Sequence, residues 1–165
     1  MKTNLLLNFN IDKENLKIII DREFNAELKT VWAAWTESQY LDQWWAPKPW
    51  QARTKNMDFS IGGHWLYAMV GPDGTEHWGR TNYLKITPLE SYTAEDVFCD
   101  SEGVINTDFP TSFFDTEFSY KNGISLVHIV VTLSSIEHLE QYISMGFKEG
   151  FISALENLDT LFENK

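Results

Sequence analysis

The amino-acid sequence predicts an α+β fold in which a curved antiparallel sheet of about six to seven strands wraps around a long C-terminal helix. Helical periodicity is confined to the two ends of the chain, whereas residues 50–133 alternate between polar and apolar side chains and contain turn residues at hairpin intervals. Helices at the ends and hairpins between them favour this class over βαβ units. The 165 residues suffice for one domain with its own core.

The C-terminal segment Ser134–Phe162 is predicted to be one long amphipathic helix. Ser134 and Glu137 have the spacing of a capping box. A helix of this length spans roughly 40 Å, so we expect a break or kink near Gly146. Gly146 and Gly150 lie on one face, either to pack closely on a strand or to leave space for a bound molecule. The apolar stripe consists of Phe147, Phe151, Ala154, Leu155, Leu158, Leu161 and Phe162.

The N-terminal part of the domain is predicted to be a strand followed by two short helices. Leu16–Phe24 is apolar and β-branched, as is typical of a strand. Asn25 is placed to cap a helix whose apolar face is formed by Leu28, Val31, Trp32 and Trp35. A second helix, from about Ser38 to Trp45, is stopped by prolines. Residues 1–15 form an N-terminal extension, and residues 16–165 form a single domain.

Further strands form a predicted antiparallel meander. The turn sequences Gly71-Pro72-Asp73-Gly74 and Lys121-Asn122-Gly123 place proline and glycine where tight turns favour them. The polar segment Asp100–Thr111 is long for a hairpin loop and is a candidate rim or lid. The predicted strands are Trp50–Phe59, His64–Val70, His77–Thr87, Ser91–Cys99, Ser112–Tyr120 and Ile124–Leu133.

The composition excludes several classes of function. A formal net charge of −11 repels phosphate backbones and acidic lipids, so we predict no nucleic-acid binding. The apolar run near the N-terminus is too short for a signal peptide or a membrane span, which predicts a cytoplasmic protein without membrane insertion. Cys99 is the single cysteine, so there is no disulfide framework. Both a monomer and a homodimer stay open.

Aromatic residues make up 15% of the chain, and their placement is the main functional signal. Trp65, Tyr67 and Met69 alternate along one strand and therefore share a face, which we expect to form a pocket wall. We place further aromatic residues around the same pocket, although core packing alone also explains several of them. These residues are Trp44, Trp45, Phe114, Phe147 and Phe151.

The adjacent strand is expected to add polar groups to the pocket. Lys85 must face solvent, so Leu84 and Ile86 should face inward. Extending this alternation backward along the strand places three more residues on the inner face, namely Trp78, Arg80 and Asn82.

An inward Arg80 would bind a carboxylate or phosphate on an otherwise apolar ligand, and Asn82 would help to orient it. Two alternatives stay open. Arg80 pairs with an internal acid such as Asp96 or Glu117, or a bulge reverses the alternation so that Arg80 faces water.

No motif for catalysis, metal binding or a cofactor is present. The chain has no Ser-His-Asp order and no glycine-rich phosphate loop. Four acids could supply a general acid or base in a cyclase-like pocket, but strand-surface acids are expected in so acidic a chain. These are Glu95, Asp96, Asp115 and Glu117. The histidines lack metal-ligand spacing: they are His64, His77, His128 and His138. We predict no catalytic residue, no metal and no cofactor.

Several blocks of sequence occur in a familiar order: Asp21–Ala26, Val31–Thr36, Trp44–Pro47, Asp58–Trp65, Gly71–Gly74, Ile86–Glu90 and Met145–Leu158. Together they resemble the SRPBCC (START-like, helix-grip) superfamily, in particular the branch named after the C-terminal domain of the heat-shock-chaperone ATPase activator. The resemblance covers about Leu16 to Phe162. Members of this branch commonly carry tryptophan at the position of Phe147.

The resemblance implies a helix-grip fold, but this fold hosts lipid carriers, hormone receptors, polyketide cyclases and co-chaperone domains, so it does not select a function. We predict a protein that binds a small hydrophobic or amphipathic molecule between the sheet and the C-terminal helix. One alternative is a co-chaperone-like interaction domain with a chaperone partner in the stress response, although the chain has no room for an additional chaperone-binding domain. The other is a cyclase- or hydratase-like enzyme, which inward acids with shifted pKa values would support.

Overall fold

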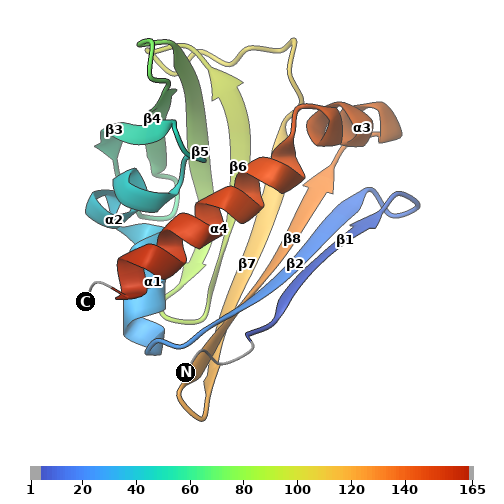
Figure 1. Ribbon diagram of the computed structural model, residues 1–165. Coiled ribbons are helices and arrows are strands. Elements are labelled where there is room, and N and C mark those ends of the chain that lie inside the picture. Colours follow the sequence, from blue (N-terminus) through green and yellow to red (C-terminus); the bar gives the residue numbers. More distant parts are fainter. Residues whose placement is uncertain (1–4, 164–165) are drawn as a thin grey trace.

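An eight-stranded antiparallel sheet curves around the C-terminal helix in the computed structural model, which describes residues 5–163 (Figure 1). The strand order across the sheet is β1-β2-β8-β7-β6-β5-β4-β3. The strands are β1 Leu7–Asp12, β2 Lys17–Phe24, β3 Gln51–Met57, β4 His64–Val70, β5 Glu76–Thr87, β6 Ser91–Cys99, β7 Ser112–Lys121 and β8 Ile124–Leu133. The helices are α1 Leu28–Thr36, α2 Ser38–Trp44, α3 Ile136–Ser144 and α4 Phe147–Glu163.

The α+β class is confirmed, but the predicted six to seven strands are too few, because Leu7–Asp12 belongs to the sheet. This segment pairs with β2 from Leu7 opposite Arg22 to Asp12 opposite Lys17. The predicted extension over residues 1–15 is therefore corrected for this segment, whose alternation of polar and apolar residues is a strand pattern. Residues 1–4 of the predicted extension lie outside the described residues.

The predicted long C-terminal helix is two helices, α3 and α4, which meet at Gly146. Gly146 has a φ of +88°, which ends α3 because an L-residue with a side chain rarely adopts this conformation. The backbone N–H of Gly150 then donates to the carbonyl of Gly146 at 2.9 Å. Ser135, not Ser134, caps α3, and its hydroxyl accepts from the backbone N–H of His138 at 3.1 Å.

The two glycines at this junction are expected to respond in opposite ways to substitution by alanine. Gly146→Ala should lower the free energy of unfolding by about 1 to 2 kcal/mol because of its left-handed backbone. Gly150→Ala should raise it by up to about 1 kcal/mol, since Gly150 lies within α4. Urea denaturation of both variants measures this. A loss at Gly150 as large as that at Gly146 would contradict the assigned backbone roles.

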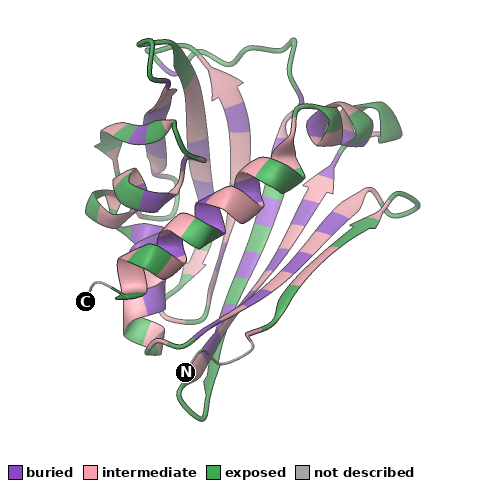
Figure 2. Ribbon diagram, in the orientation of Figure 1, coloured by how far each residue is buried: buried purple, intermediate pink, exposed green. Residues whose placement is uncertain are grey.

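Helix α4 runs diagonally across the concave face of the sheet (Figure 1) and packs against α2. The side facing the sheet carries Phe151, Ala154, Leu155 and Leu158, all of them buried (Figure 2). At full burial, each large apolar side chain contributes about 1.5 to 3 kcal/mol of transfer free energy. No helix within residues 5–163 is long and apolar enough to span a membrane.

The second half of α4 is fixed to strand β2 and to the segment after α2 by polar contacts. The guanidinium of Arg22 on β2 pairs with the carboxylate of Asp159 at 2.5 Å. The side-chain amide of Asn157 donates to the carbonyl of Ala46, just after α2, at 2.8 Å. Because these contacts lie on the C-terminal half of α4, any free space under the helix is expected near its N-terminal end.

Candidate functional site

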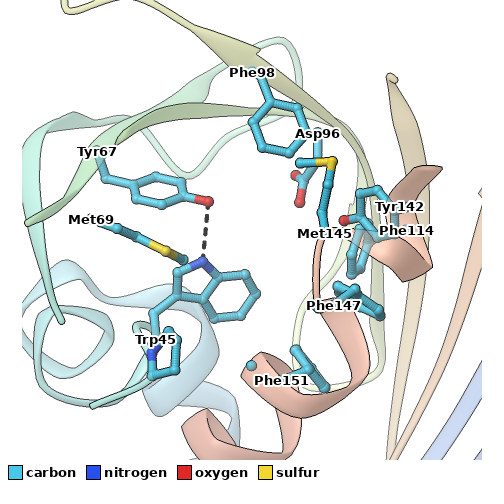
Figure 3. Close-up of a pocket in the computed structure, with 13 residues that line it drawn as sticks. Trp45, Tyr67, Met69, Asp96, Phe98, Phe114, Tyr142, Met145, Phe147 and Phe151 are labelled. Carbon is cyan, nitrogen blue, oxygen red and sulfur yellow. Dashed lines mark hydrogen bonds between the residues drawn. The ribbon is translucent and has the colours of Figure 1, made fainter. Parts of the chain in front are cut away.

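A cavity of about 250 Å³ lies between the sheet and the α3–α4 junction (Figure 3). We call it the main cavity. Its lining is largely apolar and aromatic, and it draws on β4, β6, β7 and the helices. The lining residues are Trp45, Pro47, Tyr67, Met69, Asp96, Phe98, Phe114, Tyr142, Met145, Gly146, Phe147, Gly150 and Phe151.

Two smaller spaces adjoin the main cavity. An inner void of about 10 Å³ is bordered by Trp65, Thr81 and Asp96, among others. A side cavity of about 90 Å³ is bordered by Tyr67, His77 and Asp96, among others. Asp96 lines all three spaces, so its carboxylate lies where they converge.

The aromatic wall of β4 is held in place by Trp45 and Gly79. Trp45 Nε1 donates a hydrogen bond to the Tyr67 hydroxyl at 3.1 Å, drawn as a dashed line in Figure 3. The Tyr67 ring stacks on Trp65 with centroids 4.0 Å apart. Gly79 lies opposite Tyr67 on β5, and a Cβ at Gly79 would come within 2.9 Å of the Tyr67 oxygen. The absence of a side chain at Gly79 therefore makes room for the Tyr67 ring.

The two helix glycines border open space. A Cβ at Gly146 would meet nothing within 4 Å, and a Cβ at Gly150 would meet only Pro47, at 3.7 Å. Close packing on a strand, one of the two explanations considered from the sequence, therefore does not account for either glycine. Both lie at the edge of the main cavity together with Met145, which is 45% exposed.

Asp96 is the ionisable group with the most unusual surroundings in the cavity. It is only partly exposed, and one carboxylate oxygen accepts a hydrogen bond from the Thr81 hydroxyl at 2.8 Å. Burial raises the pKa of Asp96 to about 7, Thr81 partly opposes this effect, and Glu95 adds a smaller rise through charge repulsion. No hydrogen bond within residues 5–163 engages its second carboxylate oxygen. Asp96 therefore changes charge near neutral pH and has an acceptor available to a ligand.

Hydroxyl groups face Asp96 from two sides of the cavity. In Figure 3 the oxygens of Tyr67 and Tyr142 and the carboxylate of Asp96 point into the same space. Burial is the main cause that raises the pKa of each tyrosine, so both hydroxyls keep their protons. Ser112 contacts the Tyr142 hydroxyl at 3.5 Å. Among the described residues, the lining of the main cavity includes no lysine, arginine or histidine.

The predicted inward orientation of Arg80 and Asn82 is wrong. The pairing of β5 with β6 shifts between Tyr83 and Lys85, and this bulge leaves Leu84 47% exposed. Because a bulge reverses the alternation, the inward residues before it are Gly79, Thr81 and Tyr83 rather than the even-numbered ones. Arg80 and Asn82 therefore lie on the outer face of the sheet. The bulge considered from the sequence is present, but Arg80 does not face water, because it contacts the loop that follows β6.

On the outer face, Arg80 holds the loop that follows β6. Its guanidinium donates to the carbonyl of Gly103 at 2.5 Å, and Lys55 donates to the carbonyl of Ser101 at 2.7 Å. The first half of the 100–111 loop thus covers the outer face. In its second half, Phe109 contacts Phe98, a residue of the cavity lining, with ring centroids 5.1 Å apart.

The other predicted site residues separate into three groups. Trp44 is fully buried in the core, and Trp65 borders the inner void. Trp78 borders the side cavity, but its ring lies on the outer face near the charged groups of Arg53 and Lys55, at 6.0 and 5.9 Å. The remaining predicted residues all line the main cavity: Trp45, Tyr67, Met69, Phe114, Phe147 and Phe151.

The predicted pocket residues do not include Asp96, Phe98 or Tyr142, although Asp96 was one of four acids considered for a cyclase-like pocket. A signal for the first two was present, because Tyr92, Ala94, Asp96 and Phe98 occupy alternate positions of β6 and therefore share a face. A carboxylate among apolar residues on one face of a strand indicates a candidate functional group. Tyr142 gave no such signal, since its place at the cavity depends on how α3 packs on the sheet, where its hydroxyl contacts Ser112.

The histidines lie apart from one another. His64 contacts Asn56, His128 contacts Asp21, and the His77 ring packs against Trp50 in a tilted arrangement. Within residues 5–163 there is no group of three or more histidine, cysteine or acidic side chains that could hold a metal ion.

Comparisons with known proteins place this architecture in a family. A solution NMR structure of an Arthrobacter aurescens protein superposes with a TM-score of 0.90 at 28% identity and covers 96% of this chain and 92% of that one. A crystal structure of a Mycobacterium smegmatis protein gives a TM-score of 0.87 at 29% identity, covering 95% and 96%. A solution NMR structure from Staphylococcus epidermidis gives 0.82 at 26% identity, covering 93% of each chain.

No protein with a curated description matches this chain. The family model described as activator of Hsp90 ATPase homolog 1-like protein matches residues 25–163, which is most of the chain. This match and the shared fold agree with the resemblance found in the sequence blocks. The chain belongs to the family of activator of Hsp90 ATPase homolog 1-like proteins.

Proposed function

We propose that this protein binds a small, largely apolar molecule in the main cavity. The observation that carries the proposal is an aromatic space of about 250 Å³ in which few groups are polar. Ligand sites are commonly concave, apolar and supplied with a small number of polar groups that fix orientation. Here Asp96, Tyr67 and Tyr142 take that role.

The cavity volume limits the size of the ligand. An apolar cavity of about 150 Å³ accepts benzene. The main cavity and the side cavity together therefore suit a molecule of one or two rings. The rings of Trp45, Phe114 and Phe147 offer faces and edges for aromatic stacking, worth about 0.5 to 1.5 kcal/mol for each good pair.

Filling the cavity from the helix should abolish most binding. Gly150→Leu places a branched side chain at the edge of the main cavity, where Gly150 has only Pro47 nearby. Excluding about 60 Å² of apolar contact costs about 1.5 kcal/mol, so the affinity for a neutral probe such as N-phenyl-1-naphthylamine should fall roughly tenfold. Probe fluorescence measures the dissociation constant.

Glu156→Leu is the matched control for this experiment, because Glu156 is exposed on the same helix and does not line the cavity. Its affinity for the probe should equal that of the unmodified protein. Absence of saturable binding by the unmodified protein, or equal binding by both variants, would remove the proposal.

A second candidate function is catalysis by Asp96. A carboxyl group with a pKa of about 7 in an apolar cavity has the properties of a general acid or base. This supports the cyclase- or hydratase-like alternative. Turnover of a panel of small cyclisable or hydratable substrates, lost in Asp96→Asn, is the test, and equal turnover by Asp96→Asn excludes Asp96 as the catalytic group.

Family membership favours one further candidate, a co-chaperone-type domain that binds an Hsp90-class chaperone. A pull-down with such a chaperone and measurement of its ATPase rate test this candidate. An unchanged rate together with no capture counts against it.

A further inference from the structure

We propose that the cavity is selective for organic amines of one or two rings, whose ammonium group pairs with Asp96. This inference rests on the proposed ligand-binding function and names the chemical class of the ligand. It replaces the carboxylate or phosphate ligand expected from an inward Arg80, because Arg80 lies on the outer face.

The geometry at Asp96 leaves one side of the carboxylate for a ligand. Thr81 donates to one oxygen at 2.8 Å, and no hydrogen bond within the described part of the chain uses the other. The same residue lines the main cavity, the inner void and the side cavity. A ligand whose ring occupies the aromatic part of the main cavity can therefore reach this oxygen with a short polar group.

The charges around the cavity favour a cation in that position. An ionised carboxylate in an apolar space is costly unless an opposite charge or several donors compensate it. Thr81 supplies one donor, and no lysine, arginine or histidine among the described residues lines the main cavity. A ligand ammonium would supply the missing charge, whereas a ligand carboxylate would be repelled. The net charge of −11 also raises the local concentration of cations.

The hydroxyl of Tyr67 provides a second contact for an amine. It accepts a hydrogen bond from Trp45 Nε1 at 3.1 Å and retains an oxygen lone pair. The Tyr142 oxygen, across the cavity, is a further acceptor (Figure 3). An ammonium has three donors and no acceptor, so one carboxylate and two phenol oxygens match its hydrogen-bonding capacity.

Binding of an amine should depend on pH through Asp96. The titratable groups that face Asp96 are tyrosines from four elements, namely Tyr67 of β4, Tyr83 of β5, Tyr92 of β6 and Tyr142 of α3. Burial is the main cause that raises the pKa of each of them, so none changes charge between pH 5 and pH 8.

Three other titratable groups lie nearby. Glu95 is the neighbour of Asp96 on β6, and His77 borders the side cavity. Cys99, whose pKa burial raises, lies three residues further along β6.

The test uses a matched series with one ring system and three polar ends: 1-naphthylmethylamine, 1-naphthylmethanol and 1-naphthoic acid. Isothermal titration calorimetry measures their binding to the full chain at pH 8 and pH 5. At pH 8 the amine should bind about 10- to 100-fold more tightly than the alcohol, which corresponds to one charge-assisted hydrogen bond. The acid should bind most weakly. At pH 5, where Asp96 is protonated, the advantage of the amine over the alcohol should be lost.

Asp96→Asn should remove the preference for the amine at pH 8 while the alcohol still binds. Asp115→Asn is the matched control, because the same substitution is made at an exposed position of β7, outside the main cavity. It should leave the preference intact. The comparison of pH 8 with pH 5 on the unmodified protein keeps the test decisive if Asp96→Asn does not fold.

Each contrary outcome has a distinct meaning. Equal binding of amine and alcohol at pH 8, or tightest binding of the acid, overturns the amine inference and leaves the proposed function standing. A pH dependence that persists in Asp96→Asn shows that Asp96 is not its cause and also overturns it. Binding of none of the three molecules overturns the proposed ligand-binding function itself.

Discussion

Trp44→Ala is expected to lower the free energy of unfolding by about 3 to 5 kcal/mol, the range found when a fully buried aromatic residue is truncated. Trp44 is 0% exposed, and its ring contacts Trp35 and Trp45 with centroids 4.7 and 5.1 Å apart. Its Nε1 donates to the carbonyl of Ala34 at 2.8 Å, which ties α2 to α1. The substitution creates a cavity and leaves a buried carbonyl without its donor. Guanidinium denaturation measures the loss.

Trp78→Ala is the comparison for this experiment. Trp78 is half-buried on the outer face, where its ring lies beside the Arg53 guanidinium. Its loss should cost only about 1 to 2 kcal/mol, since part of its surface is already in water. If Trp44→Ala cost no more than Trp78→Ala, the placement of Trp44 in the core would be wrong.

The second large effect concerns the pH dependence of stability, which Asp96 should dominate between pH 5 and pH 8. The pKa of Asp96 rises from 3.8 to about 7 on folding, mainly through burial. The folded state thus holds a proton that the unfolded state has released, so the stabilisation is complete below pH 3.8 and is lost as the pH rises through about 7. From pH 5 to pH 8 the free energy of unfolding of the unmodified protein should fall by roughly 2 to 3 kcal/mol relative to that of Asp96→Asn.

Urea denaturation at several pH values, with Asp96→Asn and Asp115→Asn in parallel, measures this difference. Asp115→Asn should follow the unmodified protein, because Asp115 is exposed. Asp96→Asn should be the more stable protein at pH 8 and should show the flatter profile. Parallel profiles for all three proteins would mean that Asp96 titrates in the folded state as it does in water.

Much of the fold was predictable from the sequence because local patterns dominate it. Alternation and turn residues located seven strands, and β4, β6 and β8 begin and end at the predicted residues. Leu7–Asp12 falls within the predicted extension, which lies outside the blocks that resemble the family, and its Asn8 and Asn10 disfavour a strand. Pairing with β2 and the contact between Phe9 and Phe147, with ring centroids 6.0 Å apart, compensate for that low propensity.

The polar part of the site could not be predicted in full, because it depends on the register of β5. A single extra residue at Leu84 decides whether Arg80 or Thr81 faces the cavity, and bulges have no strong sequence signature. Once Thr81 faces inward, its partner across the strand pair is Asp96. The aromatic part of the site was easier to predict, because Tyr67, Phe114 and Phe147 reach the cavity through simple strand alternation and helical spacing.

The position of β2 in the sheet has a consequence for how the chain folds during synthesis. β2 lies between β1 and β8, and Lys17 on β2 donates to Thr132 on β8, 115 residues later. The β1–β2 hairpin therefore leaves the ribosome long before its neighbour exists, with Ile18 and Ile20 unprotected from water. Closing so long a loop is entropically costly and slows folding. The nascent chain thus depends on its last third to cover its first strands. Between the synthesis of β2 and that of β8, the uncovered strands make the chain most prone to aggregation.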